Sequence, residues 1–377
     1  MARVPPTMRA ALLRSFGGPD VLQVVRDAPT PRCGPNDVLV RVAAAAVNPL
    51  DARVRAGYGA ALFRPTLPLV LGRDVSGEVV ARGANARAFP LGASVFGALS
   101  PVTPRGSHAE YVAVNEAHLA GKPPNLSHAE AAALPFATLT AHRALFATAS
   151  LAAGEKVLIL GAGGSVGFAA AQLAAARGCD VYAACAAVDV ERLLASGCVK
   201  GAWAFDGTPG AAGSTASLGR FAKENGWGSF DVALDAGPGT PSGERSAIRT
   251  LRRGVGRFVT LHGSLASLVG DQGPIAGGLS AGAELARRKI LHRAQDDVGY
   301  HWAVMRQDAD AMAEMAQLAG EEQLTARVAR TFPLEDIAEA HRAVEDVNSN
   351  AQGKTVVEVW VGEGRSSGAV LGRGSGT

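Results

Sequence analysis

Cysteine and clustered positive charge are both scarce in this sequence of 377 residues. The four cysteines, Cys33, Cys179, Cys185 and Cys198, form no C-x-x-C pair. This usage predicts free thiols in a reducing compartment and gives no disulfide framework. The formal net charge is +3 without any run of Lys or Arg, so there is no electrostatic footprint for nucleic acid. Hydrophobic residues make up 47% and charged residues 19%, which indicates a soluble globular protein with a substantial core.

Long apolar runs are nearly absent as well. Residues 157–176 carry no full charge, but their centre reads Gly-Ala-Gly-Gly-Ser and their second half is rich in Ala. We therefore expect a strand, a turn and a helix there, and no transmembrane segment. The start, "MARVPPTMRAALL", is too short and too interrupted by Pro for a secretory signal, so an organelle presequence has either been removed or never existed. The Gly/Ser-rich tail, residues 363–377, is predicted to be disordered.

The order of the elements predicts an α/β protein with two domains. Residues 8–135 read as short strands broken by Gly and Pro, which is typical of a partly open β-barrel. Ser127 and Glu130 then form a capping box at a helix start. From residue 156, strands and helices alternate, which predicts a doubly wound parallel Rossmann sheet. Residues 323–362 read as strand, helix, strand. We expect them to complete the first domain, giving one domain of 1–135 with 323–362 and a second of 136–322.

A glycine-rich turn is the strongest chemical signal. "LILGAGGSVGFAAAQLA" places Gly161, Gly164 and Gly167 directly after an apolar strand, with Ala162 in the first glycine position of the motif. A missing Cβ at Gly164 lets a diphosphate approach the backbone, and one at Gly167 lets the helix pack close to the sheet. The N–H groups of Ser165 and Val166 would then face the anion. The alternative is a tight turn without a ligand.

The end of the second strand of this sheet favours NADPH over NADH. An NAD site has a carboxylate there, whereas this chain has Cys185, Ala186 and Ala187. We interpret Asp189 as the N-cap of the next helix in preference to a ribose ligand. Arg192 or Lys200 would be the positive partner of a 2′-phosphate.

Several segments together resemble the medium-chain dehydrogenase/reductase superfamily: "VNPLDARVRAGYG", "LPLVLGRDVSGEVV", "AAALPFATLTAHRAL", "GYHWAVM", "RTFPLEDIAEAH" and "GKTVVEV". Zinc-dependent members have Cys and His where this chain has Asn48 and Arg73. Arginine offers no lone pair and Asn is a poor zinc ligand, so we expect no metal site. The chain is most similar to the zinc-independent quinone oxidoreductase branch.

That resemblance implies a GroES-like catalytic domain beside the Rossmann domain, and NADPH-dependent reduction of a small-molecule quinone or α,β-unsaturated carbonyl. It further implies a homodimer in mitochondria with a link to coenzyme Q synthesis, the cytoplasm being the alternative. The cofactor contacts that it implies are Gly163, Ser165, Val166, Ala186, Ala236, Leu261, Ala303, Met305, Asn350, Ala351 and Gln352. Ala186 replaces a family Ser, Ala236 a family Asn, and Arg53 stands where many relatives have Tyr. These departures motivate a second hypothesis, a catalytically silent scaffold or complex subunit.

Two side chains are candidates for catalysis. The Asn48 amide would donate to a substrate carbonyl, and the Tyr58 phenol would supply a proton or hydrogen bond. The alternatives are an Asx-turn before Pro49 for Asn48 and an exposed aromatic for Tyr58. We interpret Arg73 and Asp74 as an ion pair that holds their loop.

Overall fold

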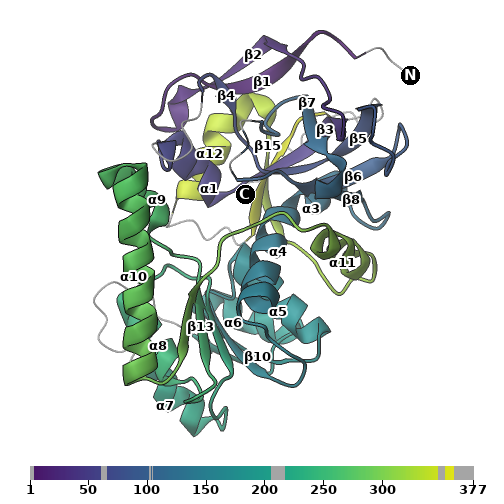
Figure 1. The fold of residues 1–377 in the computed structure, drawn as a ribbon. Helices are drawn as coiled ribbons and strands as arrows, with labels where there is room; N and C mark the ends of the chain where they lie inside the picture. The colour runs from purple at the N-terminus through teal and green to yellow at the C-terminus, as the bar shows by residue number, and fades with distance from the viewer. Residues whose placement is uncertain are drawn as a thin grey trace, which may run out of the picture.

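The computed structural model describes residues 4–60, 66–101, 103, 105–204, 217–346 and 353–360. Two large sheets lie one above the other in Figure 1, a mixed sheet in the upper half and a parallel sheet in the lower half. The predicted α/β fold is confirmed. Within the described residues no helix is both long and apolar enough to cross a membrane.

The lower sheet is parallel and has the strand order β11-β10-β9-β12-β13-β14. This is the order of a doubly wound nucleotide-binding sheet, in which the strand order reverses between β9 and β12 while all strands stay parallel. Its strands are β9 (Lys156–Leu160), β10 (Asp180–Cys185), β11 (Gly201–Ala204), β12 (Val232–Asp235), β13 (Arg257–Thr260) and β14 (Gly299–Trp302). Its helices are α5 (Ser165–Ala176), α6 (Ala187–Ala195), α7 (Ser217–Glu224), α8 (Pro241–Arg249), α9 (Leu265–Gln272) and α10 (Pro274–Gln295).

Strand β9 is central in this sheet and explains why residues 157–160 are all apolar. Val157 and Ile159 pack into the core on one face, while Leu158 and Leu160 pack into the core on the other. A strand covered by helices on both faces requires a continuous apolar run. Residues 157–176 thus form most of β9, the following turn and α5, as predicted.

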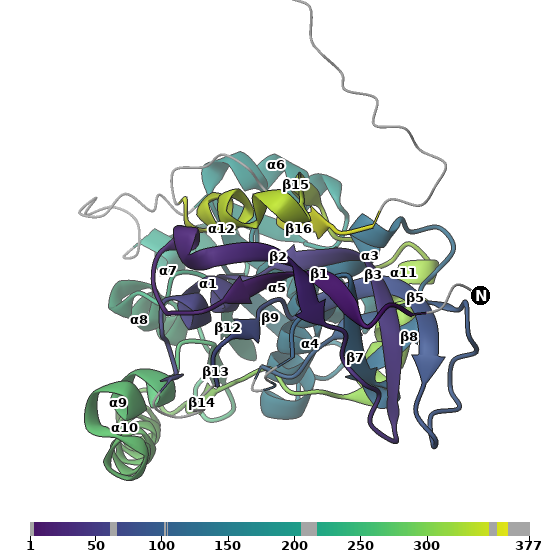
Figure 2. The same cartoon turned by 90° about the horizontal axis from the view of Figure 1, so that it is seen from above.

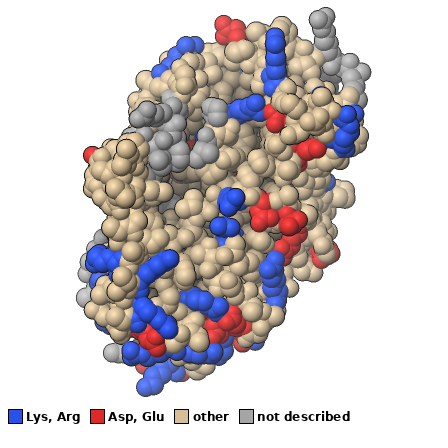
Figure 3. Space-filling view, in the orientation of Figure 1, with Lys and Arg blue, Asp and Glu red and all other residues tan. Residues whose placement is uncertain are grey.

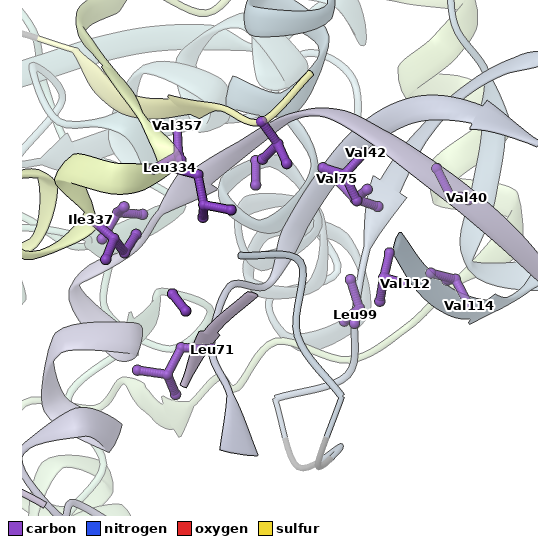
Figure 4. Close-up of a cluster of buried hydrophobic side chains, with 14 of the residues drawn as sticks. Val40, Val42, Leu71, Val75, Leu99, Val112, Val114, Leu334, Ile337 and Val357 are labelled. Carbon is purple, nitrogen blue, oxygen red and sulfur yellow. The ribbon is translucent and has the colours of Figure 1, made fainter. Parts of the chain in front are cut away.

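The upper half contains a mixed sheet of order β15-β16-β3-β5-β6-β8, with β7 on β3, and a smaller sheet of order β2-β1-β4. The strands are β1 (Thr7–Leu13), β2 (Leu22–Pro29), β3 (Asp37–Val47), β4 (Leu69–Val70), β5 (Asp74–Arg82), β6 (Ser94–Ala98), β7 (Tyr111–Asn115), β8 (Leu119–Gly121), β15 (Val328–Pro333) and β16 (Lys354–Glu358). β16 pairs antiparallel with β3, so the C-terminal strands return to the upper half, where Figure 1 shows them in yellow. Buried side chains such as Val42, Val75 and Val357 form the core between these strands (Figure 4).

The remaining helices are short, and most of them pack against the strands of the upper half. They are α1 (Pro49–Arg55), α3 (His128–Ala133), α4 (Pro135–His142), α11 (Ala309–Gly320) and α12 (Ile337–Glu345), with 3₁₀ turns η1 (Pro19–Val21), η2 (Glu116–His118) and η4 (Leu334–Asp336) and a π-helical turn η3 (Arg143–Thr148). The predicted capping box of α3 is confirmed. The Ser127 hydroxyl accepts from the Glu130 amide at 3.2 Å, and the Glu130 carboxylate accepts from the Ser127 amide at 2.9 Å.

Candidate functional site

A cleft of about 440 Å³ opens where α1, β16 and the turn after β9 meet. One side carries Asn48, Pro49, Lys354 and Thr355, and the other carries residues 163–166 of the glycine-rich turn. The sequence singled out Asn48 and the turn separately, and the fold brings them to one site.

Two of the three motif glycines in the turn are required for steric reasons. A Cβ on Gly167 would lie 2.2 Å from the Gly161 carbonyl oxygen, so only glycine lets α5 start this close to β9. Gly161 has φ +74° and its Cβ would lie 2.5 Å from the Gly237 Cα. Gly164 differs, because its Cβ would have no neighbour nearer than 3.4 Å. No contact within the protein therefore requires glycine at position 164. The missing Cβ keeps the cleft side of the turn open.

The start of α5 is suited to an anion. Gly164 is its N-cap, and no side chain caps the first amides. The free N–H groups of a first turn and the helix dipole both favour negative charge. Ser165 and Val166, the first two residues of α5, line the cleft. The residues present thus fit the diphosphate of a dinucleotide.

The other proposed cofactor contacts lie at the same edge of the sheet. Ala186 follows β10, Ala236 follows β12, Leu261 follows β13, and Ala303 and Met305 follow β14. In a parallel doubly wound sheet, ligands bind at this carboxyl edge. Ala236 lines the cleft, whereas Ala303 and Met305 are 4% and 7% exposed and pack into the core. Asn350, Ala351 and Gln352 lie outside the described residues.

The interpretation of Asp189 as an N-cap is wrong. Ala186 is the N-cap of α6, and Asp189 lies within its first turn. Its carboxylate accepts from Arg192 at 2.7 Å and lies against Gly163, where a Cβ would be 2.0 Å from the Asp189 Oδ2. Arg192 also donates to the Gly163 carbonyl at 3.1 Å. The Asp189 carboxylate and the Arg192 guanidinium thus form an ion pair that lies against Gly163.

Lys200 is at the wrong edge of the sheet to bind a 2′-phosphate. It precedes β11 and forms an ion pair with Asp180, the first residue of β10. The strands are parallel, so this pair lies at the amino edge of the sheet, away from the cleft.

Asn48 belongs to a buried hydrogen-bonded network of three side chains. Its amide nitrogen donates to the Asp74 Oδ2 at 2.8 Å, and its amide oxygen accepts from the Lys354 ammonium. Lys354 also lies 3.2 Å from the Asp74 Oδ2. Asn48, Asp74 and Lys354 are 3%, 0% and 5% exposed. The network fixes the orientation of the Asn48 amide. One N–H of the Asn48 amide donates to Asp74, and the second N–H does not take part in that bond.

Asp74 is held in place by residues at the starts of α1, β16 and α4. Its second carboxylate oxygen accepts from the Phe136 backbone amide at 2.6 Å, in the first turn of α4. Complete burial raises the pKa of Asp74, while Lys354, Asn48 and Phe136 favour its charged form. The network is therefore a buried ion pair with an amide attached, next to the cleft.

Lys354 was not identified from the sequence. The signal was present, since "KTVVEV" begins an otherwise apolar strand with a single cation. A lysine at such a position would be expected to point to solvent. Only the pairing of β16 with β3 brings it next to Asn48.

The predicted Arg73–Asp74 ion pair is wrong. The Arg73 guanidinium donates to the carbonyls of Thr103 and Arg105 at 3.0 Å each, and its Nε lies 3.9 Å from Asp51. Successive residues of an extended chain point to opposite sides, so adjacent Arg73 and Asp74 reach different partners. Arg73 does anchor a loop, but without Asp74.

Tyr58 is not part of the cleft lining. It is half-buried in the turn after α1, and the Arg53 guanidinium lies 6.0 Å from the centre of its ring. The catalytic role of Tyr58 stays a prediction.

The described residues contain no group of three His, Cys, Asp or Glu side chains that could hold a metal ion. Near the cleft, Asn48 hydrogen-bonds Asp74 and Arg73 binds carbonyl groups. Neither side chain is available as a ligand in this arrangement.

Comparisons with known proteins agree with this architecture. Residues 34–124 match the alcohol dehydrogenase GroES-like domain, and residues 215–357 match a family described as zinc-binding dehydrogenase. A protein of Danio rerio named "NAD(P)H oxidoreductase RTN4IP1, mitochondrial" is 32% identical over 93% of this chain and 91% of its own length. A solved alcohol dehydrogenase superfamily protein from Novosphingobium aromaticivorans is 28% identical with a TM-score of 0.76, covering 94% of this chain and all of its own. The quinone oxidoreductase from Coxiella burnetii is 27% identical with a TM-score of 0.73 and the same coverage.

Proposed function

Because this chain belongs to the medium-chain dehydrogenase/reductase superfamily, we propose that it is an NADPH-dependent oxidoreductase that reduces a quinone or an α,β-unsaturated carbonyl. The general class, an oxidoreductase that uses a nicotinamide cofactor, is supported by the family and by the relatives. The observation that carries the finer proposal is one cleft lined by both the glycine-rich turn and Asn48.

The turn would hold the diphosphate of the cofactor. The amides of Ser165 and Val166 would donate to it, and Gly164 leaves room for its approach. Arg192 would meet the 2′-phosphate, since it is anchored to the Gly163 carbonyl next to the turn. The bound cofactor supplies the hydride.

Asn48 would bind the carbonyl oxygen of the substrate. One N–H of its amide is held by Asp74, which leaves the other to donate into the cleft. Negative charge grows on that oxygen as hydride arrives at the substrate, and a fixed donor stabilises such charge. Lys354 lies on the same side of the cleft, where it donates to the Asn48 amide oxygen and balances the charge of Asp74. We propose Tyr58 as the proton source. Because it lies in the turn after α1 and not in the cleft lining, this role requires its phenol to reach the substrate from outside the cleft.

We propose that the reaction needs no zinc. Asn48 and Arg73 stand where zinc-dependent members have Cys and His, and both are engaged in hydrogen bonds. The Asn48 amide, held in place by Asp74 and Lys354, would instead polarise the carbonyl.

Oxidation of NADPH in the presence of a panel of quinones and enones tests this proposal. We expect turnover by the wild-type protein that Asn48→Ala lowers at least about tenfold, with the KM for NADPH unchanged. Asn125→Ala, which removes an amide bonded to the Ala319 carbonyl at 3.0 Å, is the matched control. Turnover that survives Asn48→Ala at the wild-type rate would contradict the role of this amide.

The second candidate is a catalytically silent scaffold that retains the fold. Ala186 and Ala236 support it, because neither offers a polar side chain to a cofactor at the carboxyl edge. A silent substrate panel together with copurification in a stoichiometric assembly would favour this function. Turnover that Gly164→Trp abolishes would exclude it.

The name of the Danio rerio relative supports a mitochondrial location, with the cytoplasm as the alternative. A role in coenzyme Q metabolism would follow if the quinone is ubiquinone. Fractionation of the native host, with the protein detected by antibody, tests the location.

A further inference from the structure

Helix α10 carries an apolar stripe on its outer side. Ile275, Leu279 and Ile290 are 80%, 72% and 70% exposed, and the exposed Ala286 lies between the last two. These four positions fall on one side of an α-helix and extend along roughly 22 Å of it. We call these four residues the α10 stripe. Figures 1 and 2 show α10 at the edge of the molecule, projecting beyond the parallel sheet.

The inner side of α10 is fixed, so the stripe cannot turn inward. Gly277 packs so closely on α9 that a Cβ would lie 2.3 Å from the Leu268 carbonyl oxygen. Arg288 donates to Glu244 at 2.7 Å, and His292 stacks on Tyr300 with ring centres 5.1 Å apart. The helix is bound to α8, α9 and β14 by its other face, and the stripe faces away from the protein.

Cations flank the stripe. Arg287 and Lys289 are exposed on either side of it. Arg293, with 60% of its side chain exposed, lies at the C-terminal end and pairs with Asp297 at 3.1 Å. The one acid of α10, Glu284, lies on the inner side, bonded to Ser264 and Arg288. Figure 3 shows basic side chains, with a few acidic ones among them, in the region of α8 and the lower part of α10. The exposed acids Asp271 and Asp297 lie beyond the two ends of the helix.

We propose that this face of α10 docks on the surface of an anionic lipid bilayer. Aliphatic side chains on the exposed face of a helix, with Lys and Arg at its margins, match the interfacial helices that lie in the headgroup region. The cations complement acidic phospholipids, and the apolar stripe enters the acyl boundary. A second copy of the chain fits less well, because it would bring the same exposed cations, Arg287 and Lys289, against this face, with acids only at the helix ends. The inference does not depend on the proposed activity.

Sedimentation of the full chain with vesicles tests the proposal. We expect binding to vesicles of phosphatidylcholine with an equal amount of phosphatidylglycerol, weak binding to phosphatidylcholine alone, and loss of binding as salt rises. The combined variant Ile275→Asn, Leu279→Asn, Ile290→Asn should abolish binding. Arg287→Gln and Lys289→Gln should each weaken it about fivefold. Leu91→Asn, at an aliphatic residue 38% exposed in the other half of the molecule, is the matched control and should bind as wild type.

Three results would overturn the proposal. The first is absence of binding to the mixed vesicles, and the second is binding that the stripe variant retains. The third is a dimer by light scattering that the same variant converts to a monomer, which would assign the stripe to a second copy. Circular dichroism of each variant confirms that it is folded.

Discussion

The Lys354 ammonium lies 3.2 Å from the Asp74 carboxylate, and both side chains are buried beneath the cleft. Lys354 begins β16 and Asp74 begins β5, so the contact exists only once both strands flank β3. The same lysine reaches the Asn48 amide. This ion pair therefore links the C-terminal return of the chain to the orientation of the proposed substrate-binding amide.

Lys354→Met should destabilise the fold, because it leaves Asp74 buried without its ion partner. Breaking a buried pair costs about 3–5 kcal/mol of unfolding free energy, measured by urea denaturation. In the variant the pKa of Asp74 rises further, so the folded state holds a proton that the unfolded state releases. Stability of the variant should then increase as pH falls toward the ordinary pKa of aspartate. Asp74→Asn combined with Lys354→Met should recover part of the loss, and a double variant no more stable than Lys354→Met would contradict this interpretation.

Gly164 and Gly167 should respond differently to alanine. Gly167→Ala forces a Cβ toward the Gly161 carbonyl and should cost about 1–3 kcal/mol of stability. Gly164→Ala has room within the protein and should leave the melting temperature nearly unchanged, while it weakens NADPH binding about tenfold or more. Thermal denaturation and fluorescence titration measure the two effects. Equal loss of stability in both variants would contradict the separate roles.

Asp189 and Arg192 should control the choice of cofactor. Asp189→Asn removes a negative charge next to Gly163 and releases Arg192 from its ion pair, so the ratio of NADPH to NADH affinity should rise on the order of tenfold. Arg192→Ala should lower the same ratio. Titrations of both nicotinamides against each variant give the ratio, and an unchanged ratio in both variants would place the 2′-phosphate elsewhere.

His341 should make the protein sensitive to acid. Burial, together with the neighbouring His108 and Arg55, lowers the pKa of His341 to about 2. In the unfolded chain the pKa of this histidine is about 6.5. Between pH 6.5 and pH 2 the unfolded state therefore binds more protons than the folded state. Stability should therefore fall as pH drops from about 6.5 toward 2. His341→Gln should flatten this dependence in urea denaturation across pH, and a slope as steep as that of wild type would contradict the assignment.

Local patterns were sufficient to predict the parallel sheet and its turn. The apolar run of β9 indicates a strand that is buried on both faces. The steric requirement for glycine at positions 161 and 167 makes the turn recognisable from the sequence. Lys354 could not be predicted, because its partners depend on the long-range pairing of β16 with β3. The errors at Asp189 and Arg73 were local. The N-cap lies three residues before Asp189, and the extended backbone separates Arg73 from Asp74. The boundaries of the two domains and the homodimer stay predictions.

A crystal of the protein soaked with NADPH tests whether the turn after β9 binds a dinucleotide beside Asn48, on which the proposed activity depends. We expect density for a diphosphate against the amides of Ser165 and Val166, with the nicotinamide toward Asn48 and Lys354. A cofactor bound at another surface, or a turn that excludes it at saturating NADPH, would contradict the proposal.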